Sequence, residues 1–252
     1  MTSSVAEPPA APVDKSGERV RRMFGEIAPR YDLLNHLLSM NIDRYWRWRT
    51  TKLVPVATDG PLADAPVLDL CTGTGDLALA YDRATSGRLP ITAADFCPEM
   101  LARGEEKGQR AGVNDHVEWV EADATNLPFD NETYQLVTAA FGLRNVSDTD
   151  QGLREMARVC RSGGKVAVLE FSTPRWQPFK AIYGWYFRNV LPRIGQLLMS
   201  NSSAAYEYLP ESVKAFDEYE QLAGRMERAG LTKVKFHPLT LGVATLYIGE
   251  KQ

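Results

Sequence analysis

"LDLCTGTGDLALA", residues 68–80, is the segment from which the architecture of this chain can be predicted. A short apolar run at 66–70 leads into a G-x-G-x-x-A pattern, in which Gly73 and Gly75 precede a helical pattern that begins near Asp76. Glycines at such positions let the backbone turn tightly and approach a ligand closely. The segment therefore predicts a strand, a tight turn and a helix, with a small-molecule site at the turn.

Further strand-like runs alternate with helical patterns along the rest of the chain. They lie at 91–95, 117–121, 134–140 and 165–172, and a Gly-Gly turn at 161–164 is expected before the last of them. This alternation predicts an α/β fold, a Rossmann-like domain whose mostly parallel sheet is built from βαβ units. Two final runs, at 232–239 and 242–250, predict an antiparallel C-terminal edge hairpin.

The 252 residues are enough for one domain with a substantial core. Residues 1–17 are rich in Pro, Ala and Ser and lack the features of a secretory signal, so we expect a disordered tail. Residues 18–252 then form the single domain. Within it, 18–60 predicts an N-terminal helical cap that is broken at Pro29, and 173–216 predicts a helical lid inserted after the fifth strand.

Composition limits the classes of function. The net charge of −3 argues against a general nucleic-acid-binding protein, which usually carries a basic excess. Three scattered cysteines and three scattered histidines favour a reducing cytoplasm and argue against a metal site. No uncharged apolar run approaches the roughly 18 residues that a membrane span needs. No pattern in the sequence indicates the oligomeric state of the protein.

Acidic residues at successive strand ends indicate the cofactor. Asp95 lies 20 residues beyond Gly75, where an acid can accept hydrogen bonds from the ribose hydroxyls of an adenosine cofactor. Asp69 and Asp76 flank the glycine turn, where they would repel a pyrophosphate and suit an ammonium and a sulfonium. Asp123, after the third strand, is placed to bond an adenine amino group. The pattern favours S-adenosyl-L-methionine over NAD. The alternative to a cofactor site is a tight turn followed by an unrelated acid.

Longer motifs resemble known families. Four segments are similar to the successive motifs of class I methyltransferases: "DLCTGTG", "AADFCPEML", "EADATNLPF" and "LREMARVCRSGGK". Residues 23–47 and "FGLRNVSD" at 141–148 resemble the two signatures of the ubiquinone/menaquinone C-methyltransferase family, as do 168–174 and 186–198. The resemblance covers about residues 18 to 250. It implies methylation of a ring carbon of a polyprenylated quinol.

The resemblance also implies which residues bind the cofactor. Contacts fall on Thr74, Asp95, Asp123 and Ala124, beside Asp69, Gly73 and Gly75 of the glycine turn. The implied reaction converts demethylmenaquinol to menaquinol. A benzoquinol of the ubiquinone pathway, another small acceptor, and a non-catalytic cofactor-binding scaffold of a quinone-synthesis complex remain as alternatives.

Arg144 and Asn145 follow the fourth strand, so they are expected beside the cofactor crevice. A permanent cation and a neutral donor there could orient the quinol and stabilise its oxyanion, and ionisation makes the ring carbon more nucleophilic. The alternative is that Arg144 forms a structural ion pair. Tyr31 and Asp32 are the candidate proton acceptors, with Glu170 and water as further options.

Four residues are expected to contact the substrate: Phe141, Glu170, Tyr206 and Tyr208. The segment 173–200 combines four basic residues and several aromatics with no acid. Such a segment either touches the inner face of the cell membrane transiently, since Trp and Tyr suit the headgroup region and Lys and Arg suit anionic lipid, or forms a lid that lines the tail pocket.

Overall fold

The structure is a computed structural model that describes residues 17–189 and 203–252. The tail expected at 1–17 lies outside these residues except for Gly17, which begins the first helix. Residues 190–202 of the expected lid also lie outside them.

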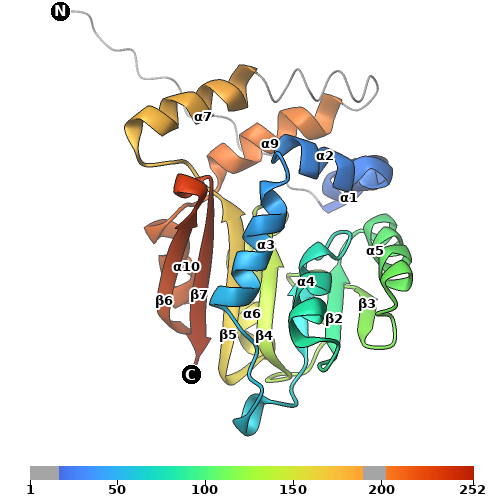
Figure 1. Ribbon diagram of the computed structural model, residues 1–252. Coiled ribbons are helices and arrows are strands. Elements are labelled where there is room, and N and C mark those ends of the chain that lie inside the picture. Colours follow the sequence, from blue (N-terminus) through green and yellow to red (C-terminus); the bar gives the residue numbers. More distant parts are fainter. Residues whose placement is uncertain (1–16, 190–202) are drawn as a thin grey trace, which may run out of the picture.

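Seven strands form one sheet in the order β3-β2-β1-β4-β5-β7-β6. Their bounds are β1 Val67–Leu70, β2 Ile91–Asp95, β3 Val117–Glu121, β4 Tyr134–Ala140, β5 Cys160–Phe171, β6 Leu231–Leu239 and β7 Ala244–Lys251. Strands β1 to β5 run parallel, while β7 is antiparallel to both β5 and β6 (Figure 1). The predicted parallel sheet with an antiparallel edge hairpin is confirmed.

The turn expected at 161–164 is wrong, because these residues belong to β5. The register shifts between Tyr134, which pairs with Cys160, and Leu136, which pairs with Lys165. Gly163 has φ +79°, and a Cβ on Gly164 would lie 2.7 Å from the carbonyl oxygen of Gln135. The two glycines therefore serve a bulge within a continuous strand, where extra residues are accommodated without ending the pairing.

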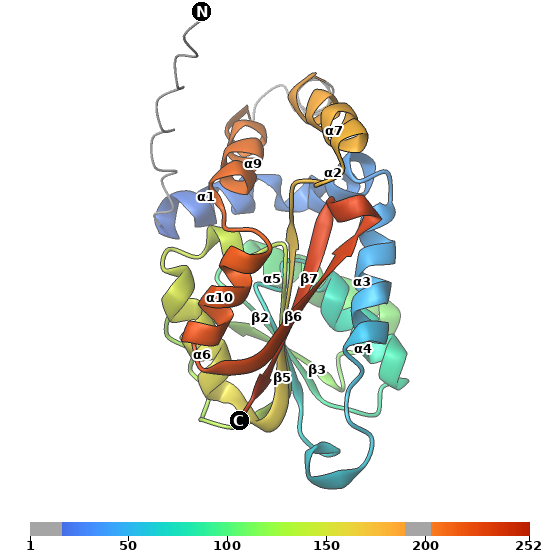
Figure 2. The same cartoon turned by 90° about the vertical axis from the view of Figure 1, so that its left-hand side faces the viewer.

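Helices cover both faces of the sheet. Their bounds are α1 Gly17–Ile27, α2 Tyr31–Leu38, α3 Ile42–Leu53, α4 Asp76–Thr85, α5 Pro98–Ala111, α6 Thr149–Val159, α7 Gln177–Asn189, α9 Ser203–Ala215 and α10 Glu220–Arg228. Figure 2 shows α6 and α10 on one side of the sheet and α3 and α4 on the other. Buried apolar side chains of these helices, such as Met156 of α6 and Trp46 of α3, fill the two layers of the core.

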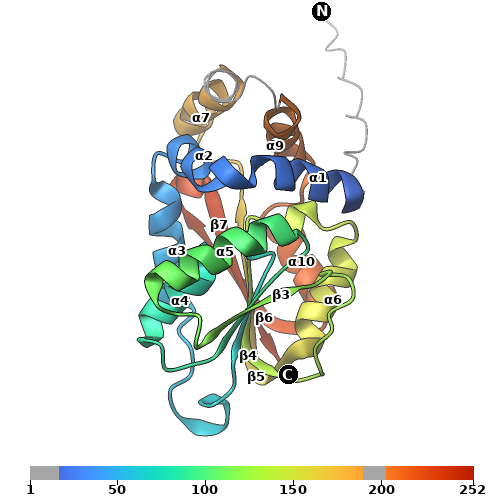
Figure 3. The same cartoon turned by 90° about the vertical axis from the view of Figure 1, so that its right-hand side faces the viewer.

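The predicted cap is present and is broken where expected. Helix α1 ends at Ile27, a short 3-10 turn at Ala28–Arg30 contains Pro29, and α2 begins at Tyr31. Helices α1 and α2 lie across the carboxyl ends of the parallel strands, with α7 and α9 beyond them (Figures 1 and 3). The cap therefore roofs the edge of the sheet at which α/β proteins bind ligands.

None of the helices in residues 17–189 and 203–252 combines the length and the apolar character that crossing a bilayer requires.

Candidate active site

Two adjoining cavities lie under the cap at the carboxyl ends of the strands. The large chamber has a volume of about 310 Å³ and the small chamber about 110 Å³. The side chains that line both are Phe24, Tyr31, Cys71, Ala140 and Phe141. Cys71 and Phe141 follow β1 and β4, the adjacent strands at which the strand order reverses. The chambers thus meet at the topological switch point, the usual ligand site of an open α/β sheet.

Two residues at this junction have a left-handed backbone conformation. Cys71 and Phe141 have φ values of +53° and +57°, which are unusual for residues with a side chain. A Cβ on Gly142 would overlap the Cβ of Cys71, so the two loops approach as closely as glycine allows. Strained backbone of this kind clusters at ligand-binding sites, where the surrounding structure holds it in place.

The small chamber holds four of the predicted cofactor residues, Gly73, Asp95, Asp123 and Ala124. The Gly73 N–H donates to Asp95 Oδ2 at 2.7 Å, and the Cys97 N–H donates to Asp95 Oδ1 at 2.9 Å. Burial raises the pKa of Asp95 above its usual value. Asp95 is therefore fixed by the glycine turn at the end of β2, as the sequence predicts.

Asn145 also lines the small chamber, whereas Arg144 lines the large one. The Oδ1 atom of Asn145 is buried and has no hydrogen-bond partner within residues 17–189 and 203–252. The two neighbours therefore line different chambers, although the sequence hypothesis assigned both to the quinol. A buried acceptor without a partner is costly unless a ligand supplies the donor.

Asp69 and Thr74 line the large chamber, while Gly75 lines neither. Asp69 is almost fully buried and accepts hydrogen bonds from Thr72 Oγ1 at 2.6 Å and Thr138 Oγ1 at 2.7 Å. Burial raises the pKa of Asp69 to about 6. Gly75 is the N-cap residue that precedes α4 and has φ +80°, and a side chain there would overlap the Trp119 ring, so its role is to let the turn close.

An ionic cluster that the sequence analysis missed ties the cap to the glycine turn. We call it the charge network; its members are Asp32, His36, Asp43, Arg47, Asp76 and Lys107. Lys107 Nζ lies 2.7 Å from carboxylate oxygens of both Asp32 and Asp76. Arg47 lies 2.5 Å from Asp43 and 3.2 Å from Asp76. Burial alone would raise the pKa of Asp76, but Arg47 and Lys107 hold it below its usual value. The negative charge of Asp76 is thus already balanced by these two cations. Asp76 is therefore weaker evidence that the glycine turn would repel a pyrophosphate.

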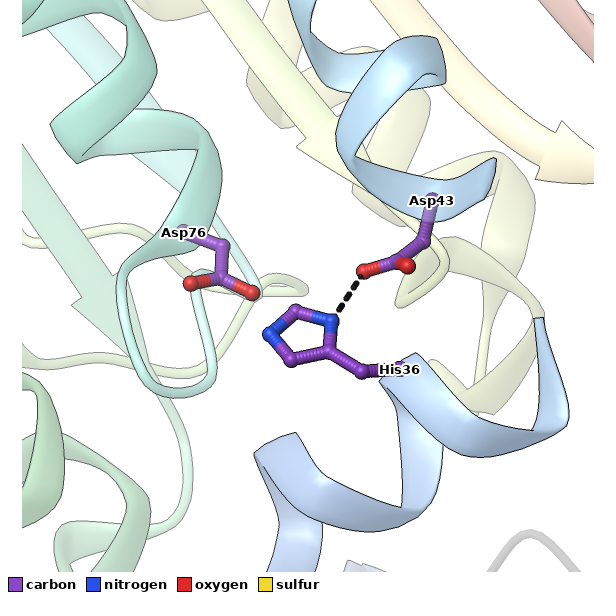
Figure 4. A group of neighbouring side chains, drawn as sticks. All are labelled: His36, Asp43 and Asp76. Carbon is purple, nitrogen blue, oxygen red and sulfur yellow. Dashed lines mark hydrogen bonds and ion pairs between the residues drawn. The ribbon is translucent and has the colours of Figure 1, made fainter. Parts of the chain in front are cut away.

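Three members of the charge network could in principle hold a metal ion. His36, Asp43 and Asp76 offer ligand atoms within 4.8 Å of one another, and Nδ1 of His36 lies 2.8 Å from Asp43 (Figure 4). Arg47 and Lys107 already neutralise the two carboxylates. Two cations beside the cluster would repel a metal ion, so we assign none here.

Arg144 forms the ion pair that the sequence analysis offered as the alternative. Its Nη1 donates to Glu170 Oε2 at 3.1 Å and to the Phe141 carbonyl, and its guanidinium lies 5.3 Å from the Phe171 ring centroid. Both charged side chains are buried, but only Arg144 lines a chamber. Its Nε has no partner among the described residues, so a donor remains beside the large chamber.

The candidate tyrosines and Asp32 occupy different surroundings. Tyr31 lines both chambers, and burial raises the pKa of its phenol, which stays protonated at neutral pH. Tyr208 is buried in the wall of the large chamber, while the side chain of Tyr206 lies outside the described part. Asp32 lines neither chamber and accepts hydrogen bonds from Thr74 and Lys107 instead.

Aromatic side chains shape the large chamber. The Phe141 ring centroid lies 4.5 Å from that of Phe171 and 5.7 Å from that of Trp46. Trp46 Nε1 donates to Thr240 Oγ1 at 2.7 Å, which holds α3 against the loop between β6 and β7. The sequence analysis did not single out Trp46 or Arg47. The local surplus of basic residues around them was the feature of the sequence that could have pointed to this part of the site.

Helix α7 presents aromatic residues to two environments. Phe179, Tyr183 and Tyr186 line the large chamber, and the Tyr186 hydroxyl donates to the Leu38 carbonyl at 3.0 Å. Trp185 is instead 58% exposed. The helix therefore closes the chamber with one face while it displays an apolar side chain on another.

The model of the ubiE/COQ5 methyltransferase family matches residues 13–251. The chain is 43% identical over 237 residues to the ubiquinone/menaquinone biosynthesis C-methyltransferase UbiE of Geotalea daltonii, covering 94% of this chain and 98% of the relative. It is 45% identical over 231 residues to the demethylmenaquinone methyltransferase of Thermus thermophilus, covering 91% and 100%.

Solved structures show the same fold at low identity. A putative S-adenosyl-L-methionine-dependent methyltransferase from Methanococcus maripaludis aligns with a TM-score of 0.59 at 16% identity, covering 99% of this chain and 98% of that one. The [4+2]-cyclase SpnF aligns with a TM-score of 0.69 at 14% identity, covering 95% and 97%. The predicted fold class is confirmed, and at such identity the likeness concerns the fold alone.

Proposed function

Because the chain belongs to the ubiE/COQ5 methyltransferase family, we propose that it methylates a ring carbon of a polyprenylated quinol with S-adenosyl-L-methionine as the methyl donor. We propose demethylmenaquinol as the acceptor and the ubiquinone-pathway benzoquinol as the second candidate, since relatives of both designations are similar over nearly the whole chain. The observation that carries the proposal is the pair of adjoining chambers, one lined by spaced acids and one by aromatic rings.

The residues of the small chamber fit S-adenosyl-L-methionine. Asp95 and Asp123 are acceptors at successive strand ends, and the orphaned Oδ1 of Asn145 would gain a donor from the ligand. Asp69 and Thr74 extend the site into the large chamber. When bound, this cofactor supplies an electrophilic methyl group. We therefore propose that Asn145 serves the cofactor and not the quinol.

Arg144 is proposed to stabilise the ionised quinol. Its guanidinium is held at the chamber wall by Glu170 behind it and by Phe171 beside it, so it is oriented before the substrate arrives. A preorganised cation in a water-poor cavity favours the oxyanion over the neutral hydroxyl, which makes the ring carbon electron-rich. Glu170 acts in this account as a positioning residue, because it lines neither chamber.

The proton of the quinol is proposed to pass to water in the large chamber. The raised pKa of Tyr31 keeps its phenol protonated, so that this residue donates a hydrogen bond and does not take a proton. Asp32 lies outside the chamber lining and is held by Lys107, which favours a role in positioning Thr74 and the cap. Phe141 and Tyr208 are proposed to contact the ring.

One assay tests the proposed function. The purified protein is supplied with methyl-labelled S-adenosyl-L-methionine and with short-chain demethylmenaquinol or the matching benzoquinol, and mass spectrometry locates the label. We expect label on a ring carbon and a higher kcat/KM with the naphthoquinol. Label on a quinol oxygen would contradict the proposal, while cofactor binding by calorimetry without turnover of either quinol would favour a scaffold.

We also propose that the protein works in the cytoplasm, in transient contact with the inner face of the cell membrane. Leu33, Leu37, Trp48, Ile182 and Trp185 are exposed on α2, α3 and α7. Exposed apolar and Trp side chains suit the headgroup region of a bilayer. Co-sedimentation with anionic vesicles at low and at high salt measures this contact, and absence of binding at low salt would contradict it.

A further inference from the structure

We propose that the two ligands reach the reaction centre by separate openings. The polyprenyl tail leaves the large chamber between Met40, in the turn after α2, and Ile182 of α7, whereas the cofactor enters the small chamber beside Arg21 and Ser147. This inference rests on the proposed function and adds a tail-binding site and a route to it.

The first opening is marked by side chains that are both exposed and part of the chamber wall. Met40 is 66% exposed and Ile182 is 63% exposed, and both line the large chamber. Leu38 and Phe179 line the chamber from the same two helices. An isoprenoid chain gains by burying apolar surface against such side chains, and it can continue outward past them.

The second opening has the opposite chemistry. Arg21, whose side chain is 42% exposed, lines the small chamber together with the exposed residues Asp123 and Ser147. Arg21 is held beside this opening by Glu121 at 3.2 Å and lies over the Phe96 ring. A charged, water-soluble cofactor would be admitted by polar groups that stay hydrated, while a prenyl chain would not.

The cap need not lift for either ligand. Lys107 of α5 holds Asp32 of α2 at 2.7 Å, and Tyr186 of α7 holds the Leu38 carbonyl at 3.0 Å. Between the chambers, Phe24 and Tyr31 meet edge to face with centroids 6.1 Å apart. With the roof held in place and a separate opening for each ligand, the spent cofactor can be exchanged while a long-tailed quinol stays bound.

Charged substitutions at the apolar opening test the tail route. Met40→Glu and Ile182→Glu are assayed with demethylmenaquinol carrying one isoprene unit and with a homologue carrying several. We expect the ratio of the two KM values, long tail over short, to rise at least about tenfold, because the tail would have to cover a carboxylate where it now contacts an apolar side chain. Leu241→Glu is the matched control: Leu241, between β6 and β7, is 59% exposed and lines neither chamber, so its ratio stays at the wild-type value.

Ser147→Trp tests the second opening, because a bulky ring there narrows the entrance to the small chamber. We expect slower association of S-adenosyl-L-methionine in stopped-flow binding, at least about tenfold, with the KM ratio unchanged. Calorimetric binding of the cofactor by Met40→Glu and Ile182→Glu at wild-type affinity shows that these variants are folded.

The outcomes separate the inference from the function on which it rests. Equal KM changes for both tail lengths, or the same change in Leu241→Glu, overturn the tail route and leave the methyltransferase proposal standing. An altered KM ratio in Ser147→Trp, with unchanged cofactor association, overturns the second opening. The wild type is assayed first on the one-unit quinol, so absence of turnover there overturns the proposed function, and the tail route with it.

Discussion

Arg144 and Arg47 are both buried in the wall of the large chamber, yet their surroundings differ. Arg144 faces one carboxylate, that of Glu170, and its Nε remains without a partner in the part of the chain that the structure describes. Arg47 lies between two carboxylates, with one terminal nitrogen on Asp43 and the other on Asp76. An arginine that is paired with a single carboxylate has N–H groups left to donate to a ligand. An arginine that lies between two carboxylates links the structural elements that carry them.

Stability alone cannot distinguish these two roles. Breaking a buried ion pair leaves a charge without compensation, which costs about 3–5 kcal/mol whether the pair is catalytic or structural. Activity can distinguish them, because only a group that stabilises developing charge should change kcat strongly.

The largest effect is expected from Arg144→Met, which removes the cation and leaves Glu170 charged and buried. We expect kcat to fall about 10²–10³-fold and the free energy of unfolding to fall by about 3–5 kcal/mol. Steady-state kinetics with the short-chain quinol and urea unfolding measure the two quantities.

The double variant Arg144→Met/Glu170→Gln is the matched control, because it removes both charges of the pair and keeps a side-chain acceptor for the backbone N–H groups that donate to Glu170. It should regain most of the lost stability, since no charge is left buried without a partner. It should not regain kcat. Recovery of kcat together with stability would mean that Arg144 acts only as half of an ion pair.

Arg47→Met should lower the free energy of unfolding by about 3 kcal/mol, because Asp43 and Asp76 lose a shared partner. Lys107 still neutralises Asp76, which limits the loss. At saturating cofactor, kcat should change less than about tenfold, because both terminal nitrogens of Arg47 are already held by carboxylates. A loss of kcat as large as that in Arg144→Met would place Arg47 in the reaction itself.

The pH dependence of the unfolding free energy offers a further comparison of Arg47 with Arg144, because the carboxyl group of Asp69 has a shifted pKa. Because burial raises its folded pKa to about 6, above its unfolded value near 3.8, wild-type stability declines as pH rises through that window. Asp69→Asn removes this decline, so its advantage in unfolding free energy should grow from pH 4 to pH 6, reach at most ~3 kcal/mol and then level off.

Arg47 is the cation that lowers the pKa of Asp69 most. In an Arg47→Met background, the pH range over which the unfolding free energy declines should therefore extend to higher pH. In an Arg144→Met background, this range should not change. Urea unfolding between pH 4 and pH 8 measures both. The same displacement in both backgrounds would show that the two arginines act on Asp69 alike.

The smallest effect is expected from Arg175→Ala, a reference for an arginine outside the chambers. Arg175 pairs with Glu220, and both side chains are largely exposed, so solvent screens the pair. The melting midpoint and kcat should stay close to those of the wild type. A shift in midpoint as large as that of Arg47→Met would mean that burial does not explain the difference between these arginines.

Much of the fold follows from local chemistry that can be read along the chain. Apolar runs, Gly73 and Gly75 at the turn, and Pro29 in the cap each act on a few neighbouring residues, and the structure has the corresponding strands, turn and helix break. The spaced acids Asp95 and Asp123 do come together in one chamber, because parallel strands end at one edge of a sheet.

What the sequence could not show depends on residues that are distant along the chain. Glu170 lies 26 positions from Arg144, and Lys107 lies 75 positions from Asp32; no periodicity encodes either pair. The neighbours Arg144 and Asn145 line different chambers, and nothing in their adjacency along the chain indicates that separation. Local patterns determine which elements form, because a few adjacent residues suffice, whereas packing of distant segments decides which side chains meet, because burial and charge pairing are settled only when those segments are in contact.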